Sequence, residues 1–206
     1  MLFEKWEEGR HDARLRTNYF RSLSRVILDL ARTPLPGIGS FVLDRKGYLR
    51  LTNRPLTAEI QQLENEHIPV DMARTSTHST VDSYVSDIFA LHESRLRHQP
   101  NGVNNLGDGA YQTAALTVMR SVWSCFFRRD LRRGPFFLNL TALNQTNILV
   151  DDEWNVKCLI DLEWACSHPV EMIQPPYWLT NQPIDLINAD DYEVLHREFV
   201  DALARK

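Results

Sequence analysis

The residues with the clearest capacity for chemistry lie between residues 134 and 165. Asn147 ends a polar loop and precedes an apolar segment, and Asp161 follows a second apolar segment, 14 residues later. A β-hairpin of this length would bring the Asn147 amide oxygen and the Asp161 carboxylate to one end of a two-stranded ladder. Such oxygen atoms suit Mg²⁺, which also binds water and phosphate oxygens. One interpretation of the pattern is therefore a metal site of the kind that phosphoryl transfer requires.

The same two residues also fit a purely structural interpretation. Asparagine before a strand and aspartate after one are common turn and capping residues, because their side chains bond nearby backbone groups. Spacing alone favours this structural reading over the metal site. Glu163 has two interpretations as well: it could support the metal site, or it could make a structural hydrogen bond or ion pair.

The sequence of this stretch resembles that of kinase-like phosphotransferases. Their loop reads H-x-D, four residues and Asn, followed by a hairpin and a metal-binding Asp. The chain has LTALNQTNILVDDEW at residues 140–154 and IDLEWA at residues 160–165. These segments resemble the aminoglycoside phosphotransferase and choline kinase-like group, above all a fungal branch with LTDLHQSNIFVDDEW and DLEWA. TNRPL at residues 52–56 and PPYWLT at residues 175–180 extend the likeness over residues 18–180.

The resemblance implies a fold and a set of ligands. The expected fold is α+β and mainly helical, the C-terminal lobe of a protein kinase-like fold with short β-hairpins. Residues 1–206 would form a single domain. By resemblance, Asn147 and Asp161 would bind Mg²⁺ and, with it, the nucleotide ATP.

Two positions depart from the family pattern. Leu140 stands at the loop histidine position, as it often does in the fungal branch, and Ala142 stands at the position of the catalytic aspartate. In the family that aspartate orients the acceptor hydroxyl and accepts its proton, which an alanine methyl cannot do. Loss of a positioned base costs on the order of 10²–10⁴-fold in rate. The resemblance therefore implies a degenerate, pseudokinase-like site.

The N-terminal nucleotide-binding lobe of such kinases is not recognisable. No glycine-rich loop precedes residue 18, and neither Lys5 nor Lys46 has the strand context of the family's lysine. We therefore expect the C-terminal lobe alone, with an apolar face where the other lobe would lie. That face would suit a protein partner.

The remaining elements follow from hydrophobic periodicity and turn residues. The sequence predicts helices over 11–33, 81–98, 110–129 and about 190–204, and strands over 40–53 (a hairpin), 136–141, 148–150 and 156–160. Residues 54–80 are expected to be irregular and residues 101–109 a flexible connector. The helix over 110–129 is the most apolar and is expected to run through the core. The basic run Arg128, Arg129, Arg132 and Arg133 is expected to be a solvated helix end.

Composition restricts the class of protein. A formal net charge of -4 gives no electrostatic reason to expect a nucleic-acid partner. Three cysteines without close spacing argue against a disulfide framework or a zinc site. No apolar run is long enough to cross a membrane, and no secretory signal is visible. We therefore expect a soluble cytoplasmic protein.

Three hypotheses about function stay open at this point. The first is a degenerate phosphotransferase-like domain that binds Mg²⁺–nucleotide or a protein partner. The second is the C-terminal lobe of an active ATP-dependent small-molecule kinase in which the catalytic aspartate has been replaced. The third is a protein-interaction module in which Asn147 and Asp161 serve the fold alone.

Overall fold

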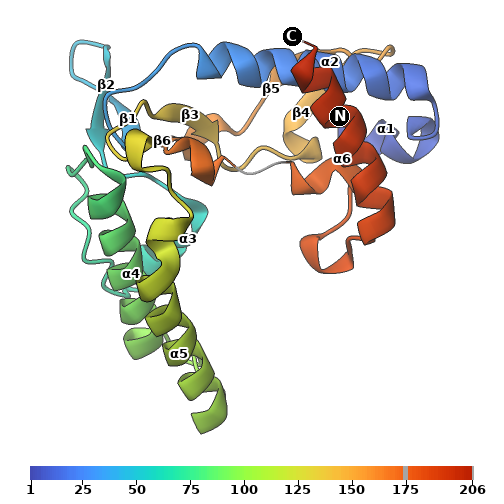
Figure 1. Ribbon diagram of the computed structural model, residues 1–206. Coiled ribbons are helices and arrows are strands. Elements are labelled where there is room, and N and C mark those ends of the chain that lie inside the picture. The colour runs from blue at the N-terminus through green and yellow to red at the C-terminus, as the bar shows by residue number, and fades with distance from the viewer. Residues whose placement is uncertain (174–175, 206) are drawn as a thin grey trace. The chain divides into compact units, whose positions relative to one another are not determined.

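The computed structural model describes residues 1–173 and 176–205 and has an α+β fold (Figure 1). α-Helices and 3₁₀-helices together take up about half of the described residues, and the strands form small antiparallel sheets. This confirms the predicted α+β class, whereas the kinase-like assignment and the single domain stay predictions. The described residues fall into two compact units, called here unit 1 (residues 1–33, 142–163 and 176–205) and unit 2 (residues 34–141 and 164–173).

Unit 1 combines helices with one hairpin. Its elements are α1 (Leu2–Gly9), α2 (Ala13–Ala31), β4 (Ile148–Val150), β5 (Val156–Leu159), α6 (Ala189–Ala204) and the 3₁₀ turns η3 (Gln145–Asn147), η6 (Tyr177–Thr180) and η7 (Ile184–Leu186). α2 and α6 pack against each other (blue and red in Figure 1). Phe20 from α2 and Phe199 from α6 meet edge to face at 6.0 Å between ring centroids. The predicted helices over 11–33 and 190–204 are thus confirmed.

The first helix, α1, was not expected from its charged sequence. Leu2 and Trp6 point into the core of unit 1 and are fully buried. The Trp6 ring stacks on the ring of Trp154, with centroids 5.4 Å apart. Two apolar residues four positions apart are enough to anchor a short helix once the hairpin supplies an aromatic surface.

Unit 2 contains a four-stranded antiparallel sheet in the order β2-β1-β6-β3. The strands are β1 (Gly39–Leu43), β2 (Leu49–Asn53), β3 (Phe137–Leu140) and β6 (Ala165–His168). The hairpin predicted over 40–53 is confirmed, and its turn is closed by Asp44, which accepts hydrogen bonds from the backbone N–H groups of Lys46 and Tyr48. β6 was not predicted, because a four-residue segment gains strand character only from its neighbours on both sides.

Three α-helices complete unit 2: α3 (Ala58–Asn65), α4 (Val81–His98) and α5 (Leu106–Val122). The prediction for α4 is confirmed to the residue. α3 corrects the expectation that residues 54–80 are irregular throughout. Its N-terminus is capped by the Thr57 hydroxyl, which accepts from the N–H of Ile60, and Ile60 and Leu63 are buried on one face.

The expectation that α5 runs through the core is wrong. The helix begins at Leu106, within the predicted connector, and ends at Val122, and none of its residues is buried. Leu106, Tyr111 and Val118 are 90%, 76% and 59% exposed. α4 lies alongside α5 (Figure 1) and contacts it, but apolar residues occur all round α5, so one neighbour cannot cover them. Within the described ranges, no helix is long and apolar enough to cross a bilayer.

The basic run after α5 is also placed differently from the prediction. The α-helix stops at Val122 and is followed by the 3₁₀ turns η1 (Trp123–Cys125) and η2 (Arg129–Leu131). Arg128, Arg129, Arg132 and Arg133 therefore lie in and around a turn and not at a helix end. The helical spacing of the arginines in the sequence was misleading because the α-helix already ends at Val122, before the first of them.

Candidate functional site

The β4–β5 hairpin positions the two predicted metal ligands in unit 1. Ile148 pairs with Leu159 in the antiparallel ladder. The pairing continues one residue further, where the N–H of Ile160 donates to the carbonyl oxygen of Asn147 at 3.0 Å. Asn147 and Asp161 therefore flank the open end of the same hairpin, as the spacing predicted.

The Asn147 side chain is held by the loop that precedes it. Its Nδ2 donates to the carbonyl oxygen of Ala142 at 3.0 Å. Its Oδ1 lies 3.1 Å from the Thr146 hydroxyl, which lies closer, at 2.5 Å, to Asn144 Oδ1. Asn144 also donates to the Ala142 carbonyl, at 3.2 Å. Asn147 is only 8% exposed. Because an amide oxygen has two lone pairs, Oδ1 keeps one for a further donor or a cation.

Asp161 differs from Asn147 in its surroundings. It follows β5 with a φ of 56°, which is the left-handed region, and its side chain is exposed. Aspartate tolerates this backbone conformation better than most residues do. Glu163 is exposed as well. The carboxylate of Asp161 is thus open to solvent and to ligands.

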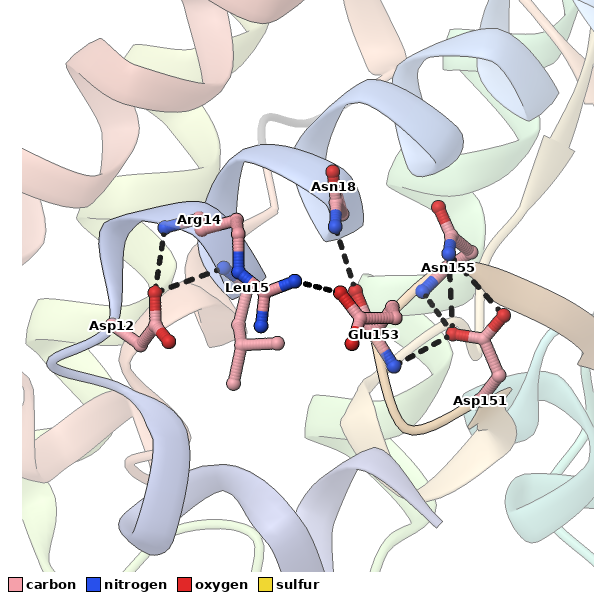
Figure 2. A network of polar contacts seen from close by, with 7 residues as sticks. All are labelled: Asp12, Arg14, Leu15, Asn18, Asp151, Glu153 and Asn155. Atoms are coloured by element: carbon pink, nitrogen blue, oxygen red, sulfur yellow. Dashed lines mark hydrogen bonds and ion pairs between the residues drawn. The ribbon is translucent and has the colours of Figure 1, made fainter.

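The far end of the hairpin is fixed by polar contacts to α2 (Figure 2). Within the turn, the Asp151 carboxylate accepts from the N–H groups of Glu153 and Asn155 at 3.1 and 2.8 Å. These bonds to Asn155, with Lys157 nearby, lower the pKa of Asp151. The Arg14 guanidinium donates to the Glu153 carboxylate, and the Asn18 side-chain amide donates to the Glu153 carbonyl oxygen.

Lys5 adds a further contact to this turn, donating to Asp152 at 2.8 Å. The bond to Asp152 raises the pKa of the Lys5 ammonium. These contacts hold the hairpin, and through its ladder the pair Asn147 and Asp161, in one orientation within unit 1.

Gln145 is a site residue that sequence reasoning missed. Its side chain is buried, and Nε2 donates to the carbonyl oxygens of Trp178 and Leu179 at 3.0 and 3.3 Å. The loop is therefore tied to η6, which contains most of the PPYWLT segment; Pro175 of that segment lies outside the described residues. A buried glutamine cannot be told from an exposed one by residue type, so only the contact identifies it.

Asn147 and Asp161 are the residues that could hold a cation at this end of the hairpin. Two oxygen groups, Asn147 Oδ1 and the Asp161 carboxylate, flank one end of the hairpin, and Mg²⁺ commonly accepts one or two protein ligands with water and phosphate oxygens. Among residues 1–173 and 176–205, no group of three or more His, Cys, Asp and Glu side chains could hold a metal ion. Bound there, Mg²⁺ would neutralise phosphate charge.

Ala142 lies at the start of this loop and is half-buried. Its backbone carbonyl receives the amides of Asn144 and Asn147, whereas its methyl group can neither accept a proton nor orient a hydroxyl. The loop therefore has no base at this position.

Comparisons with known proteins give no match for this chain: no family model, curated protein or solved structure matches it.

Proposed function

We propose that the chain binds a Mg²⁺–nucleotide, of which ATP is the expected form, through Asn147 and Asp161, and transfers phosphate inefficiently because Ala142 replaces a base. This is a degenerate phosphotransferase-like function. The observation that carries it is the hydrogen bond from the Ile160 N–H to the Asn147 carbonyl. That bond sets the two ligands on either side of the hairpin end, and the exposure of Asp161 leaves its carboxylate accessible.

The test is calorimetric titration of the 206-residue chain with ATP, with and without Mg²⁺. Binding is expected only with Mg²⁺, and Asp161→Ala is expected to weaken it by about tenfold or more, since one charged ligand is lost. Asp201→Ala is the matched control: it removes the same charge from an exposed position of α6 in the same unit. Equal affinities for the two variants, or no binding at about 1 mM nucleotide, would refute the proposal.

A cytoplasmic location belongs to the same proposal. Cys125, Cys158 and Cys166 are free thiols, as suits a reducing compartment where ATP is abundant. Its check is the location of a fluorescent fusion in cells.

The alternative of an active kinase lobe predicts a different effect of an aspartate at residue 142. It requires that an aspartate there give rapid transfer to a small hydroxyl or amine acceptor once the remaining nucleotide-binding elements are supplied. Ala142→Asp is the variant that distinguishes this alternative from the proposal.

A protein-interaction module is a second candidate, favoured by one observation. α5 exposes Leu106, Tyr111 and Val118, and a large exposed apolar surface commonly marks a contact with another protein. The double variant Leu106→Glu/Val118→Glu should keep the native helix content and lose any concentration-dependent association in sedimentation velocity. Unchanged sedimentation of a monomer in both proteins would remove this support. The protein partner expected at an apolar face of the kinase-like lobe stays a prediction.

A further inference from the structure

A second polar site lies in unit 2, at the basic run that follows α5. A cavity of about 430 Å³ opens there. It is lined by three arginines, two aspartates and the N-terminal capping residue of α4: Arg129, Arg132, Arg133, Asp82, Asp130 and Thr80. The Mg²⁺–nucleotide proposal does not involve any of these residues, since its ligands lie in unit 1.

The arginine turn is firmly anchored. The carbonyl oxygen of Arg132 accepts from the N–H of Val81 at 2.9 Å. The N–H of Gly134 donates to the carbonyl oxygen of Leu131 at 3.0 Å, which closes the turn. The Arg132 guanidinium lies over the Trp123 ring, 5.3 Å from its centroid. A ligand would therefore meet guanidinium groups carried on a fixed backbone, which lowers the entropy cost of binding.

The carboxylates beside the cavity are already paired. Arg132 donates to Asp82 at 3.2 Å. Arg128 holds Asp130 through both of its carboxylate oxygens, at 3.2 and 2.5 Å. Nearby, Glu171 accepts from the backbone N–H of Arg128 at 3.0 Å.

Two lining arginines are left over once these pairs are assigned. In the described part of unit 2, neither Arg129 nor Arg133 lies within ion-pair distance of a carboxylate. The Nε–H of Arg132 is buried and has no acceptor among the described residues. The cavity therefore offers two guanidinium groups without a carboxylate partner, those of Arg129 and Arg133.

We propose that this cavity binds the phosphate group of a small phosphate monoester, with Arg129 and Arg133 as its charged ligands. A phosphate dianion has three terminal oxygens and can accept the planar N–H pairs of two guanidinium groups at once, whereas a carboxylate has only two oxygens. The volume also exceeds what an inorganic phosphate fills and lies within the range of small-molecule sites. No metal is needed, because the arginines supply the positive charge.

The test is calorimetric titration, without divalent cations, of the full chain with inorganic phosphate, glycerol 3-phosphate and acetate. Both phosphates should bind, glycerol 3-phosphate more tightly, and acetate at least about tenfold more weakly. The double variant Arg129→Gln/Arg133→Gln should weaken phosphate binding by about tenfold or more. The matched control is Arg21→Gln/Arg25→Gln, which makes the same charge change on the exposed face of α2 and should bind phosphate as the native chain does.

Three results would overturn the proposal. They are the absence of phosphate binding, equal binding of acetate and phosphate, and equal weakening by the two double variants, which would reflect net charge alone. A thermal unfolding scan of each variant shows whether it is folded. If the Arg129→Gln/Arg133→Gln variant unfolds early, Arg129→Lys/Arg133→Lys keeps the charge and should still lose affinity, since lysine cannot form the paired contact. Asp161→Ala should leave phosphate binding unchanged, so this test is independent of the nucleotide site.

Discussion

The side-chain amide of Asn147 donates a hydrogen bond of 3.0 Å to the carbonyl oxygen of Ala142. The residue proposed as a metal ligand thus also holds the loop in which the catalytic aspartate of the resembled family would lie. Its nitrogen serves the fold, whereas its oxygen is the atom proposed to bind the cation. The two roles can be separated because they use different atoms of one side chain.

Asn147→Asp should therefore destabilise the metal-free protein. A carboxylate cannot donate, so the Ala142 carbonyl loses its closer amide partner and two acceptors face each other in a buried position. The expected loss in the free energy of unfolding is about 1–3 kcal/mol, measured by urea denaturation.

Asn188→Asp is the control for that change. Asn188 only accepts, from the N–H groups of Asp190 and Asp191 at the start of α6, so an aspartate can replace it as a cap with a loss well under about 1 kcal/mol. Equal losses for the two variants would contradict a donor role for Asn147.

Ala142→Asp examines whether the alanine limits chemistry. If the nucleotide site forms as proposed, a carboxylate at residue 142 should raise Mg²⁺-dependent ATP turnover by about 10²-fold or more, in keeping with the usual worth of a positioned base. The measurement is phosphate release, together with transfer to small hydroxyl and amine acceptors. Unchanged turnover in a variant that still binds Mg²⁺–ATP would show that the lost base is not what limits the rate, and would count against the active-kinase alternative.

Arg54, the arginine of the TNRPL segment, forms a buried ion pair with Glu64 in unit 2. Arg54 is 3% exposed, and its guanidinium lies 2.5 Å from Glu64 and also donates to the Met72 carbonyl. Arg54→Met should cost about 3–5 kcal/mol of unfolding free energy, because it leaves a partly buried carboxylate with one exposed partner. Arg74→Met removes that exposed partner of the same carboxylate and should cost less than about 1 kcal/mol.

The same pair has a pH signature. Burial raises the pKa of Glu64, but the two arginines outweigh it and hold the pKa below its usual 4.5. A carboxyl group with a depressed folded-state pKa stabilises the protein above its ordinary pKa and loses that contribution as pH falls through the folded value. The acid limb of a stability profile below pH 4.5 should therefore be less steep in Arg54→Met than in the native protein.

His168 gives a second, separate pH window. Burial lowers its pKa from 6.5 to about 4, and its ring lies beside the Tyr84 hydroxyl at 3.1 Å and the Cys166 sulfur at 3.4 Å. As pH falls from 6.5 to 4, the unfolded chain takes up a proton that the folded protein resists. Stability is therefore full above pH 6.5 and should drop by about 3 kcal/mol over this window.

His168→Gln should flatten the profile between pH 6.5 and 4, whereas His11→Gln, at an exposed position, should leave it unchanged. A smaller slope should persist in His168→Gln, because burial also lowers the pKa of His78, with Asp87 acting in the opposite sense. An identical profile in native protein and His168→Gln would rule out His168 as the source.

The sequence by itself determined the helices and hairpins that are specified by residues close together in the chain. α2, α4 and α6 follow from apolar residues at helical spacing with a capping residue before each, and both hairpins follow from their turn residues. The approach of Asn147 to Asp161 also followed from sequence, since hairpin length alone decides which residues share an end of the ladder.

Only the tertiary structure decided which apolar residues are covered and which polar groups are paired. α5 is apolar and exposed, whereas the charged segment of α1 buries Leu2 and Trp6, because burial depends on what packs alongside and not on residue type. β6 becomes a strand through β1 and β3, and Gln145 becomes part of the loop through Trp178 and Leu179. Arg129 and Arg133 stand out from their neighbours only once the partners of Arg128 and Arg132 are known, since charge pairing is a property of the folded chain.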